Sequence, residues 1–388
     1  MLNPTNLQRR HFLGAFSALA GSQAVRAAPA KTAGVNQDVH FTSDGVPLPP
    51  REYAQLLTRV TEAKDIAEDN YSREGIVAEL EQRMAALLGK ECAVFLPSGT
   101  LANHLAARIQ ANGHRVLVQQ ESHFYNDEGD CAQRLSALNL VPLAPGKGSF
   151  TLADVEEAVG RSDHGRVATP VGVISIESPV RRKSGEVFPF DEMKRITVFA
   201  RQRGIRLHLD GARMFLAAPY TGVTPKQYSA LFDTVYVSLY KYFNANFGAI
   251  LAGPRTLLED LYHTRRMFGG GLPHVWPEAA VALHFLDGFE GRYAKAVTTS
   301  EAFLARLSEH SGFTVQRITP GSNIAIATIP ARDPAAYQNK LGTVGINVGT
   351  PKASKLAGHI ELPLITNETV GRRSADELAR AFVEAAGS

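Results

Sequence analysis

The chain has 388 residues, of which 44% are hydrophobic and 20% are charged, and this balance excludes a disordered, fibrous or disulfide-scaffold protein. Its formal net charge of +3 arises at the N-terminal end, because residues 1–30 contain three arginines and no acidic residue. The rest of the chain has 38 basic and 38 acidic residues. This balance argues against a nucleic-acid or anionic-membrane partner, since either would need a clustered positive surface. We therefore expect a small ligand that is recognised locally.

The first 30 residues are typical of an export signal. Arg9 and Arg10 precede a weakly apolar stretch, Phe12–Ala20, which is too short to span a bilayer, since a spanning helix needs about 20 apolar residues. Small residues follow, as they do before a signal-peptide cleavage point, and the arginine pair followed by Phe-Leu resembles a twin-arginine export signal. The alternative is an alanine-rich tail with a chance arginine pair. We expect a periplasmic mature protein that begins near residue 28 or 31 and has no membrane anchor.

Short apolar runs alternate with helical patterns in the middle of the chain. Helical spacing of apolar residues appears at 53–66 and 76–88. Beyond these, predicted strands cover 93–96, 115–119, 172–177, 205–210, 234–239 and 248–252, and predicted helices include 101–112, 152–159 and 193–203. This alternation predicts an α/β fold with a doubly wound, mostly parallel sheet. Ligands of such sheets bind at the carboxyl ends of the strands.

The pattern changes near residue 293, and a chain of this length commonly forms two domains. A helix is predicted at 300–308, strands at 313–317, 324–329 and 359–363, and a terminal helix at 375–386. This order indicates a smaller α+β domain. We expect a signal peptide at 1–30, an N-terminal arm and large domain at 31–292, and a small C-terminal domain at 293–388.

Several common cofactor motifs are absent from the sequence. It contains no phosphate loop of the Gly-x4-Gly-Lys-Ser/Thr type, no dinucleotide Gly-x-Gly-x-x-Gly motif and no zinc-binding spacing of cysteine or histidine. We therefore expect no bound ATP, NAD or metal. Cys92 lies in an apolar run and is interpreted as a buried free thiol, whereas the sequence does not decide whether Cys92 and Cys131 are bridged.

Two charged residues stand at the ends of predicted strands. Asp210 ends an apolar run and is followed by Gly-Ala, and a buried charge there is costly unless a cation meets it. It either caps the next helix or holds a protonated ring nitrogen of a cofactor. Lys241 follows the strand at 234–239. It is either a surface lysine with a buried stem or a desolvated amine able to form a Schiff base.

Two further sites lie near the starts of helices. The run Ser98-Gly99-Thr100 separates a predicted strand from a helix, which makes it either an ordinary N-cap or an anion site formed by free backbone N–H groups. His123 comes shortly after the strand at 115–119. It is either a structural histidine or a ring that lies against a flat ligand.

The order of these features resembles that of fold-type-I enzymes dependent on pyridoxal 5'-phosphate (PLP). In more detail, the sequence resembles the threonine aldolase branch of the aromatic-amino-acid β-eliminating lyase/threonine aldolase family. The similar segments are 80–103, 121–129, 207–218, 238–253 and 267–271. The resemblance spans roughly residues 40–290 and fades in the predicted small domain.

The resemblance implies a role in PLP binding for each of five residues. Lys241 matches the lysine that binds the cofactor covalently. Asp210 would keep the pyridine nitrogen protonated, which makes the cofactor an electron sink. Gly99 and Thr100 match the residues around the phosphate, and His123 matches the histidine stacked on the ring.

The family resemblance also implies a set of substrate contacts. Arg213 matches an arginine beside the cofactor that binds the substrate carboxylate through its planar fork of donors. Ser43 and Tyr71 match a serine and a tyrosine near the substrate, although both are equally compatible with solvated loops. His123 is the candidate base for the substrate hydroxyl, and Lys241 is the rival.

The implied activity is cleavage of a β-hydroxy-α-amino acid to glycine and an aldehyde. The alternatives are a β-eliminating lyase, which releases pyruvate and ammonia, and a binding protein that kept the fold without turnover. A homodimer or homotetramer is expected from the family.

Some positions depart from the aldolase pattern and weaken the assignment of L-threonine as substrate. The run Val180-Arg181-Arg182 stands where the aldolases have a second histidine, so that an arginine could face the pocket instead. Tyr240 replaces a small residue beside the lysine. The second carboxylate-binding arginine of the small domain has no clear counterpart, and neither does an arginine after the glycines at 269–271.

Overall fold

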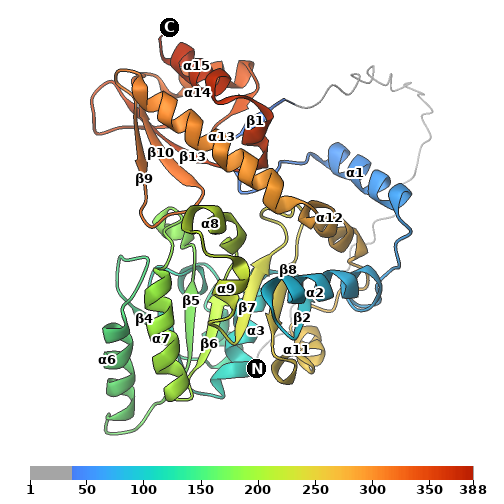
Figure 1. Ribbon diagram of the computed structural model, residues 1–388. Coiled ribbons are helices and arrows are strands. Elements are labelled where there is room, and N and C mark those ends of the chain that lie inside the picture. The colour runs from blue at the N-terminus through green and yellow to red at the C-terminus, as the bar shows by residue number, and fades with distance from the viewer. Residues whose placement is uncertain (1–36, 388) are drawn as a thin grey trace, which may run out of the picture. The chain divides into compact units, whose positions relative to one another are not determined.

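The computed structural model describes residues 37–387, so the predicted signal peptide at 1–30 lies outside the described residues. The main sheet has seven strands in the order β2-β8-β7-β6-β5-β3-β4 (Figure 1). Their bounds are β2 Cys92–Leu96, β3 Arg115–Gln119, β4 Leu140–Leu143, β5 Val171–Glu177, β6 Arg206–Asp210, β7 Thr234–Ser238 and β8 Ala249–Gly253. Strands β3 to β7 are parallel, and β8 is antiparallel to both β2 and β7. The predicted α/β class with a mostly parallel sheet is confirmed.

Helices cover both faces of this sheet because successive side chains of a buried strand point to opposite sides. On one face, Leu207 and Leu209 of β6 pack in a core with helices α2, α6 and α7. On the other face, Tyr236 of β7 packs against α3. The helix bounds are α1 Pro50–Ala63, α2 Gly75–Leu88, α3 Gly99–Ala111, α4 His123–Asn126, α5 Cys131–Ser136, α6 Leu152–Asp163, α7 Phe190–Gln202, α8 Met214–Thr221, α9 Pro225–Ser229, α10 Arg255–Leu258, α11 Leu261–Met267 and α12 Trp276–Leu286.

Strand β4 is the one strand of the main sheet that the sequence did not predict. It has four residues and contains Pro142, which would break the hydrogen-bond ladder in the interior of a sheet. The strand lies at the edge, where it pairs only with β3. A proline is tolerated there because one side of an edge strand needs no partner.

A second sheet lies in the C-terminal part of the chain, with the order β12-β13-β10-β9. The strand bounds are β9 Thr314–Arg317, β10 Ile324–Ile329, β12 Lys352–Ala353 and β13 Ile360–Ile365, and the helices are α13 Phe289–Glu309, α14 Pro334–Thr343 and α15 Ala375–Ala386. Two 3₁₀ helices cover Arg181–Lys183 and Glu368–Arg372. The predicted helix at 300–308 is thus the last part of a longer helix that begins at Phe289.

The N-terminal arm packs against this C-terminal sheet. Strand β1, Val39–His40, pairs in parallel with β11, Ile346–Asn347. Val39 and Phe41 are buried in the same apolar core as the C-terminal strands and helices. The residues that follow, from 42 to 46, continue from this core toward Asn244 near the main sheet, since Val46 N–H donates to Asn244 Oδ1 at 2.8 Å.

Both cysteines are free thiols. Cys131 is buried, but Cys92 is half-buried, so the prediction of a fully buried Cys92 was wrong. The reason is its place at the start of β2, where the strand enters the edge of the sheet next to β8. Within residues 37–387, no helix is long and apolar enough to cross a lipid bilayer.

Candidate active site

A cavity of about 360 Å³ opens at the carboxyl ends of the parallel strands. Asp210 is the last residue of β6 and Glu177 the last of β5, while Lys241 lies three residues after β7 and His123 four residues after β3. All four line the cavity. The residues Gly99, Thr100, Asn103, Asp127, Glu128, Arg213, Tyr236, Tyr240, Asn246 and Phe247 also line it. Six of the eight residues predicted for the site therefore share one cavity.

Asp210 is held at the base of this cavity by two donors. Its Oδ1 accepts from the backbone N–H of Ala212 at 3.1 Å, and its Oδ2 accepts from Asn103 Nδ2 at 2.8 Å. The side chain is almost fully buried, with 3% of the residue exposed. Within residues 37–387, each oxygen has a single donor, so the carboxylate keeps capacity to accept a hydrogen bond from a cationic group in the cavity.

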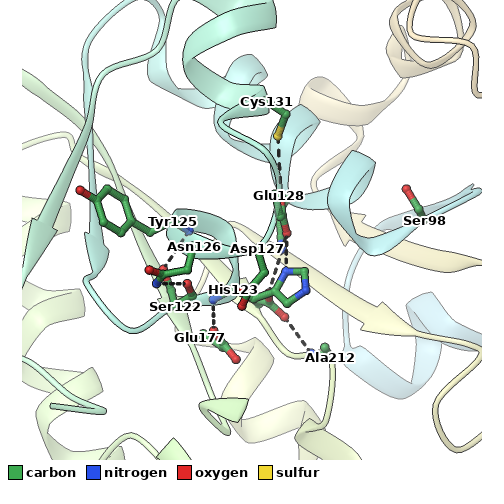
Figure 2. A network of polar contacts seen from close by, with 12 residues as sticks. Ser98, Ser122, His123, Tyr125, Asn126, Asp127, Glu128, Cys131, Glu177 and Ala212 are labelled. Carbon is green, nitrogen blue, oxygen red and sulfur yellow. Dashed lines mark hydrogen bonds and ion pairs between the residues drawn. The ribbon is translucent and has the colours of Figure 1, made fainter. Parts of the chain in front are cut away.

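His123 forms an ion pair with Glu128 beside Asp210. Its Nδ1 lies 2.9 Å from Glu128 Oε1, and the Glu128 side chain is fully buried (Figure 2). The hydrogen bond to Glu128 raises the pKa of His123, against the opposing effect of burial, and the charges of Glu128, Asp210 and Glu177 add to the rise. The backbone N–H of His123 also donates to Glu177 Oε2 at 2.6 Å.

Glu177 anchors two loops at the edge of the cavity. Its Oε1 accepts from the backbone N–H of Arg181 at 3.0 Å, and its Oε2 binds the His123 backbone. Burial raises the pKa of Glu177, and the nearby charge of Asp210 raises it further. The residue therefore sets the position of the loop after β3 relative to the loop after β5.

Lys241 lies in an aromatic part of the cavity. Its Nζ is 5.6 Å from the ring centre of Tyr240 and 6.0 Å from that of Tyr236. Burial lowers the pKa of Lys241 to about 8, and repulsion by Arg213 contributes, while Asp210 acts in the opposite direction. A lowered pKa gives the amine a larger neutral fraction, which is the form that attacks a carbonyl carbon.

The N-terminus of α3 forms another wall of the cavity. Ser98 caps this helix, because its Oγ accepts from Leu101 N–H at 3.2 Å, and the first backbone N–H groups of a helix have no acceptor within the helix. Gly99 is required here by a close approach, since a Cβ at this position would lie 2.0 Å from Tyr236 Oη. The 13-residue helix thus presents free N–H groups and the Thr100 hydroxyl to the cavity, an arrangement suited to an anion.

Arg213 supplies a buried cation whose guanidinium is shared with Asp44. Arg213 Nε donates to Asp44 Oδ2 at 2.7 Å, and both side chains are about 90% buried, with 11% and 10% exposed. Asp44 Oδ1 also accepts from Asn323 Nδ2 at 3.2 Å. Although burial acts in the opposite direction, Arg213 holds the pKa of Asp44 below its usual value. With Nε engaged, the two terminal nitrogens of Arg213 remain for a ligand carboxylate.

Ser43 and Tyr71 are not among the residues that line the cavity. Ser43 Oγ donates to the carbonyl of Gly45 at 2.9 Å, although the neighbouring Asp44 reaches Arg213. Tyr71 is 38% exposed, and its ring lies 4.7 Å from the Arg266 guanidinium. The structure therefore brings six predicted residues together and leaves these two outside.

The sequence analysis missed four polar residues that complete the site. These are Asp44, Asn103, Glu128 and Glu177. The sequence positions of three of them could have indicated that they belong to the site. Asn103 lies one helical turn after Gly99 and thus on the same face of α3, Glu128 follows His123 in one loop, and Glu177 ends a predicted strand as Asp210 does.

The geometry of these residues fits PLP, which has a phosphate, an aldehyde and a basic ring nitrogen. The N-terminus of α3 suits the phosphate, the Lys241 amine suits the aldehyde, and the buried Asp210 carboxylate suits a protonated ring nitrogen. All three groups face the same cavity. His123 lies in the same cavity beside Asp210 and Glu128, and it can cover one face of the ring.

Comparisons with known proteins agree with this geometry. The family model described as beta-eliminating lyase matches residues 43–328. A low-specificity L-threonine aldolase of Candida albicans is 32% identical over 56% of this chain and 58% of its own length, so the chain spans little more than half of that relative. A low specificity L-threonine aldolase of Escherichia coli is 26% identical over 84% of this chain and 94% of its own length.

Among solved structures, a Listeria monocytogenes protein assigned as an L-allo-threonine aldolase superposes with a TM-score of 0.74. It is 25% identical, and the match covers 89% of this chain and 96% of that one. Since the family model covers most of the described residues and the cavity-lining residues from Pro97 to Phe247 lie within it, the chain belongs to the beta-eliminating lyase family.

Proposed function

We propose that this protein is a PLP-dependent carbon–carbon lyase that cleaves a β-hydroxy-α-amino acid to glycine and an aldehyde. The observation that carries the proposal is the convergence of Lys241, Asp210 and His123 on one cavity. The threonine aldolases among its relatives support it.

Two residues and one helix terminus would hold the cofactor and determine its chemistry. Lys241 would bind the aldehyde carbon, Asp210 would pair with the ring nitrogen, and the N-terminus of α3 would bind the phosphate. When bound, PLP accepts the electron pair that remains on the substrate Cα after cleavage. The Asp210 carboxylate favours this because it stabilises a positive charge on the ring nitrogen.

Arg213 would orient the substrate through its α-carboxylate. Its guanidinium is buried and fixed at Nε by Asp44, so the direction of its remaining N–H groups is set before the substrate arrives. A fork of two parallel donors matches a carboxylate. This contact would hold the Cα–Cβ bond in a constant orientation within the cavity.

His123 would act as the base for the β-hydroxyl. Removal of the hydroxyl proton lets the oxygen form a C=O bond as the Cα–Cβ bond breaks, so that the aldehyde leaves and the electron pair stays on Cα. Protonation of Cα then completes glycine. His123 lines the cavity, and imidazole is the side chain whose ordinary pKa suits proton transfer at physiological pH.

The activity is tested by incubating the purified, PLP-loaded protein with L-threonine, L-allo-threonine and L-serine. Acetaldehyde and glycine in equal amounts from either threonine isomer support the proposal. Ammonia with pyruvate from L-serine, or with 2-oxobutyrate from the threonines, and no aldehyde would instead indicate β-elimination. No product from any of these amino acids, together with no visible absorbance from bound cofactor, would indicate a binding protein without turnover.

We also propose that residues 1–30 direct the protein to the periplasm through a twin-arginine pathway. The support is the sequence alone, with Arg9 and Arg10 ahead of a short apolar stretch. Cell fractionation of the full chain and of a variant with both arginines replaced by lysine tests this. Export that is unaffected by the double substitution, or retention of the full chain in the cytoplasm, would contradict it.

We further propose a homodimer or homotetramer, on the support of the family resemblance. Light scattering coupled to size-exclusion chromatography measures the mass directly. A mass close to the 42.0 kDa of one chain at micromolar concentration would contradict this proposal.

A further inference from the structure

The His123 ring is fixed at only one of its two nitrogens. Nδ1 contacts Glu128 Oε1 at 2.9 Å, whereas Nε2 has no hydrogen-bond partner among the described residues. Figure 2 shows Glu128 between Cys131 and His123, with the second ring nitrogen of His123 on the side away from Glu128. The carboxylate therefore determines which nitrogen remains available to a molecule in the cavity.

Glu128 is itself held in place by a second donor. Asn103 Nδ2 donates to the same oxygen, Oε1, at 2.8 Å, and the Cys131 thiol lies 3.8 Å from Oε2. Asn103 Nδ2 also donates to Asp210 Oδ2 at 2.8 Å. One amide group thus spans two buried carboxylates, one of which faces the imidazole and the other the proposed site of the ring nitrogen.

The orientation of the Asn103 amide is set from behind the site by His208. His208 Nε2 lies 3.0 Å from Asn103 Oδ1, and His208 Nδ1 lies 2.8 Å from Thr234 Oγ1. Burial lowers the pKa of His208 to about 4, so the ring is neutral and carries one proton. Since Gln110 Nε2 donates to Thr234 Oγ1 at 2.7 Å, the Thr234 hydroxyl is free to donate to His208 Nδ1. Because the Asn103 amino group donates to the two carboxylates, its Oδ1 faces His208 Nε2. An amide oxygen only accepts, so the proton of neutral His208 is on Nε2.

These contacts require the Asn103 amino group to point at the two carboxylates. Burial raises the pKa of Glu128, whereas its hydrogen bonds to His123 and Asn103 act in the opposite direction and favour the ionised form. An ionised carboxylate accepts hydrogen bonds and does not donate them, so the ring nitrogen that faces ionised Glu128 carries a proton. Neutral imidazole has one proton. With that proton on Nδ1, Nε2 has an unshared electron pair and can accept a proton from a ligand.

We propose that Glu128 is a positioning residue that holds His123 as its Nδ1–H tautomer and thereby leaves Nε2 as the base that the reaction uses. The inference rests on the proposed function for the role of the base, but the tautomer it assigns is independent of that role. Glu128 acts through His123.

The charged groups around His123 influence the pKa of its ring, and they determine which substitution is expected to change that pKa most. Glu128 faces the ring from the same loop, Asp210 from β6 and Glu177 from β5, and all three favour the protonated ring, whereas burial disfavours it. Lys241 and Arg213 are the cations of the same cavity. Of the carboxylates, Glu128 alone bonds the ring directly, so its removal is expected to change the ring most.

The first test is nitrogen NMR of the cofactor-loaded protein labelled with ¹⁵N-histidine, in which the His123→Gln variant identifies the His123 signals. Above the His123 pKa, the wild-type ring is expected to show a protonated Nδ1 and an unprotonated Nε2. A wild-type ring with its proton on Nε2 and not on Nδ1 would overturn the proposal, and this result needs no substitution at Glu128.

The second test is the Glu128→Gln variant, which keeps the size of the side chain and its ability to accept from Asn103 but removes the charge. The His123 pKa is expected to fall, because the protonated ring loses its ion-pair partner. The acidic limb of kcat/KM for aldehyde release then moves to lower pH. At the optimum, kcat falls about 10-fold, a part of the roughly 10²- to 10⁴-fold that a positioned base contributes.

Glu121→Gln is the matched control, because Glu121 precedes His123 on the same loop and bonds Gly146 N–H rather than the ring. It should leave the His123 signals and the pH profile unchanged. A Glu128→Gln protein with an unchanged His123 tautomer, pKa and acidic limb would overturn the proposal. If the wild-type protein releases no aldehyde, the proposed function fails, and the NMR measurements still decide the role of Glu128.

Discussion

The two sides of the active-site cavity differ in the groups that surround their ionisable side chains. On the side of α3 and β6, Asn103 and the backbone N–H of Ala212 donate to buried carboxylates. On the side of β7 and the segment after it, the Lys241 amine lies 5.6 Å from the ring centre of Tyr240 and 6.0 Å from that of Tyr236. One wall therefore gives its buried carboxylates hydrogen-bond donors, which oppose the effect of burial on the pKa of Glu128, while burial in the other lowers the pKa of the amine to about 8.

This difference assigns separate tasks to the two walls. A carboxylate that must remain charged needs fixed donors, because an ionised group in a protein interior is costly without them. An amine that must attack a carbonyl needs surroundings that favour its neutral form, since a well-solvated lysine is almost entirely protonated at neutral pH. The site thus contains a wall that supplies hydrogen-bond donors to its buried carboxylates beside a wall in which burial favours the neutral amine.

The largest effect is expected from Lys241→Ala, which removes the amine from the aromatic wall. Aldehyde release should fall below detection, because no other described residue offers an amine at this position in the cavity. Visible absorbance of the dialysed protein and acetaldehyde production measure the two consequences. Wild-type activity in this variant would mean that the aromatic wall has no role in catalysis.

A smaller loss is expected from Asp210→Asn on the opposite wall. The amide cannot stabilise a positive ring nitrogen, so kcat is expected to fall by about 10²-fold, as when a preorganised electrostatic contact is lost. Asp191→Asn on the surface of α7, where the side chain is 90% exposed, is the control. Equal activity of the two variants would show that the charge of Asp210 is not needed.

A third prediction concerns the stability of the cofactor-free protein. Folding lowers the Lys241 pKa from 10.5 to about 8, so at pH 7 the fold contains a disfavoured charge that Lys241→Met removes. The variant is expected to be more stable than the wild type by up to about 3 kcal/mol at pH 7. As pH rises above 8 the folded wild type loses this proton, so the difference shrinks and vanishes above 10.5.

Urea unfolding of both proteins at pH 7 and pH 9.5 measures this difference. Lys194→Met, on the exposed face of α7, should change stability by no more than about 0.5 kcal/mol. A Lys241→Met protein that is less stable than the wild type at pH 7 would show that the aromatic wall tolerates the charged amine without cost.

The smallest effect is expected from Asn103→Ala on the hydrogen-bonded wall. Each of the two buried carboxylates loses one donor, which is expected to destabilise the fold by about 1–3 kcal/mol. Thermal unfolding measures the loss, with Asn139→Ala, an exposed asparagine, as the comparison. If both substitutions shift the midpoint equally, the amide between the carboxylates contributes nothing specific to stability.

The predicted residues that share the cavity lie at or near the ends of regular elements. Asp210 ends one short predicted strand and Lys241 follows another, and parallel strands bring such ends to one edge of the sheet. Gly99 and Thr100 lie at the start of α3, just after the end of β2, so their place near this edge was also predictable. Their proximity was therefore predictable from secondary structure alone.

Other contacts depend on how distant segments pack, which the local pattern does not contain. Asp44 reaches Arg213 across 169 positions of the sequence, and the strand β1 before it pairs with β11 near the other end of the chain. Tyr71 is a different case. It lies beside Arg266 in a surface region, and one chain taken alone does not place it in the cavity.

The Asp44 carboxylate joins three parts of the chain, since it accepts from Arg213 and from Asn323 and follows the arm that packs on the C-terminal sheet. Any shortening of the protein that passes residue 44 would leave the Arg213 guanidinium without its counter-charge. Such a truncated protein could retain both sheets and yet bind amino acids in a wrong orientation. For recombinant production, the safe starting point lies ahead of Val39.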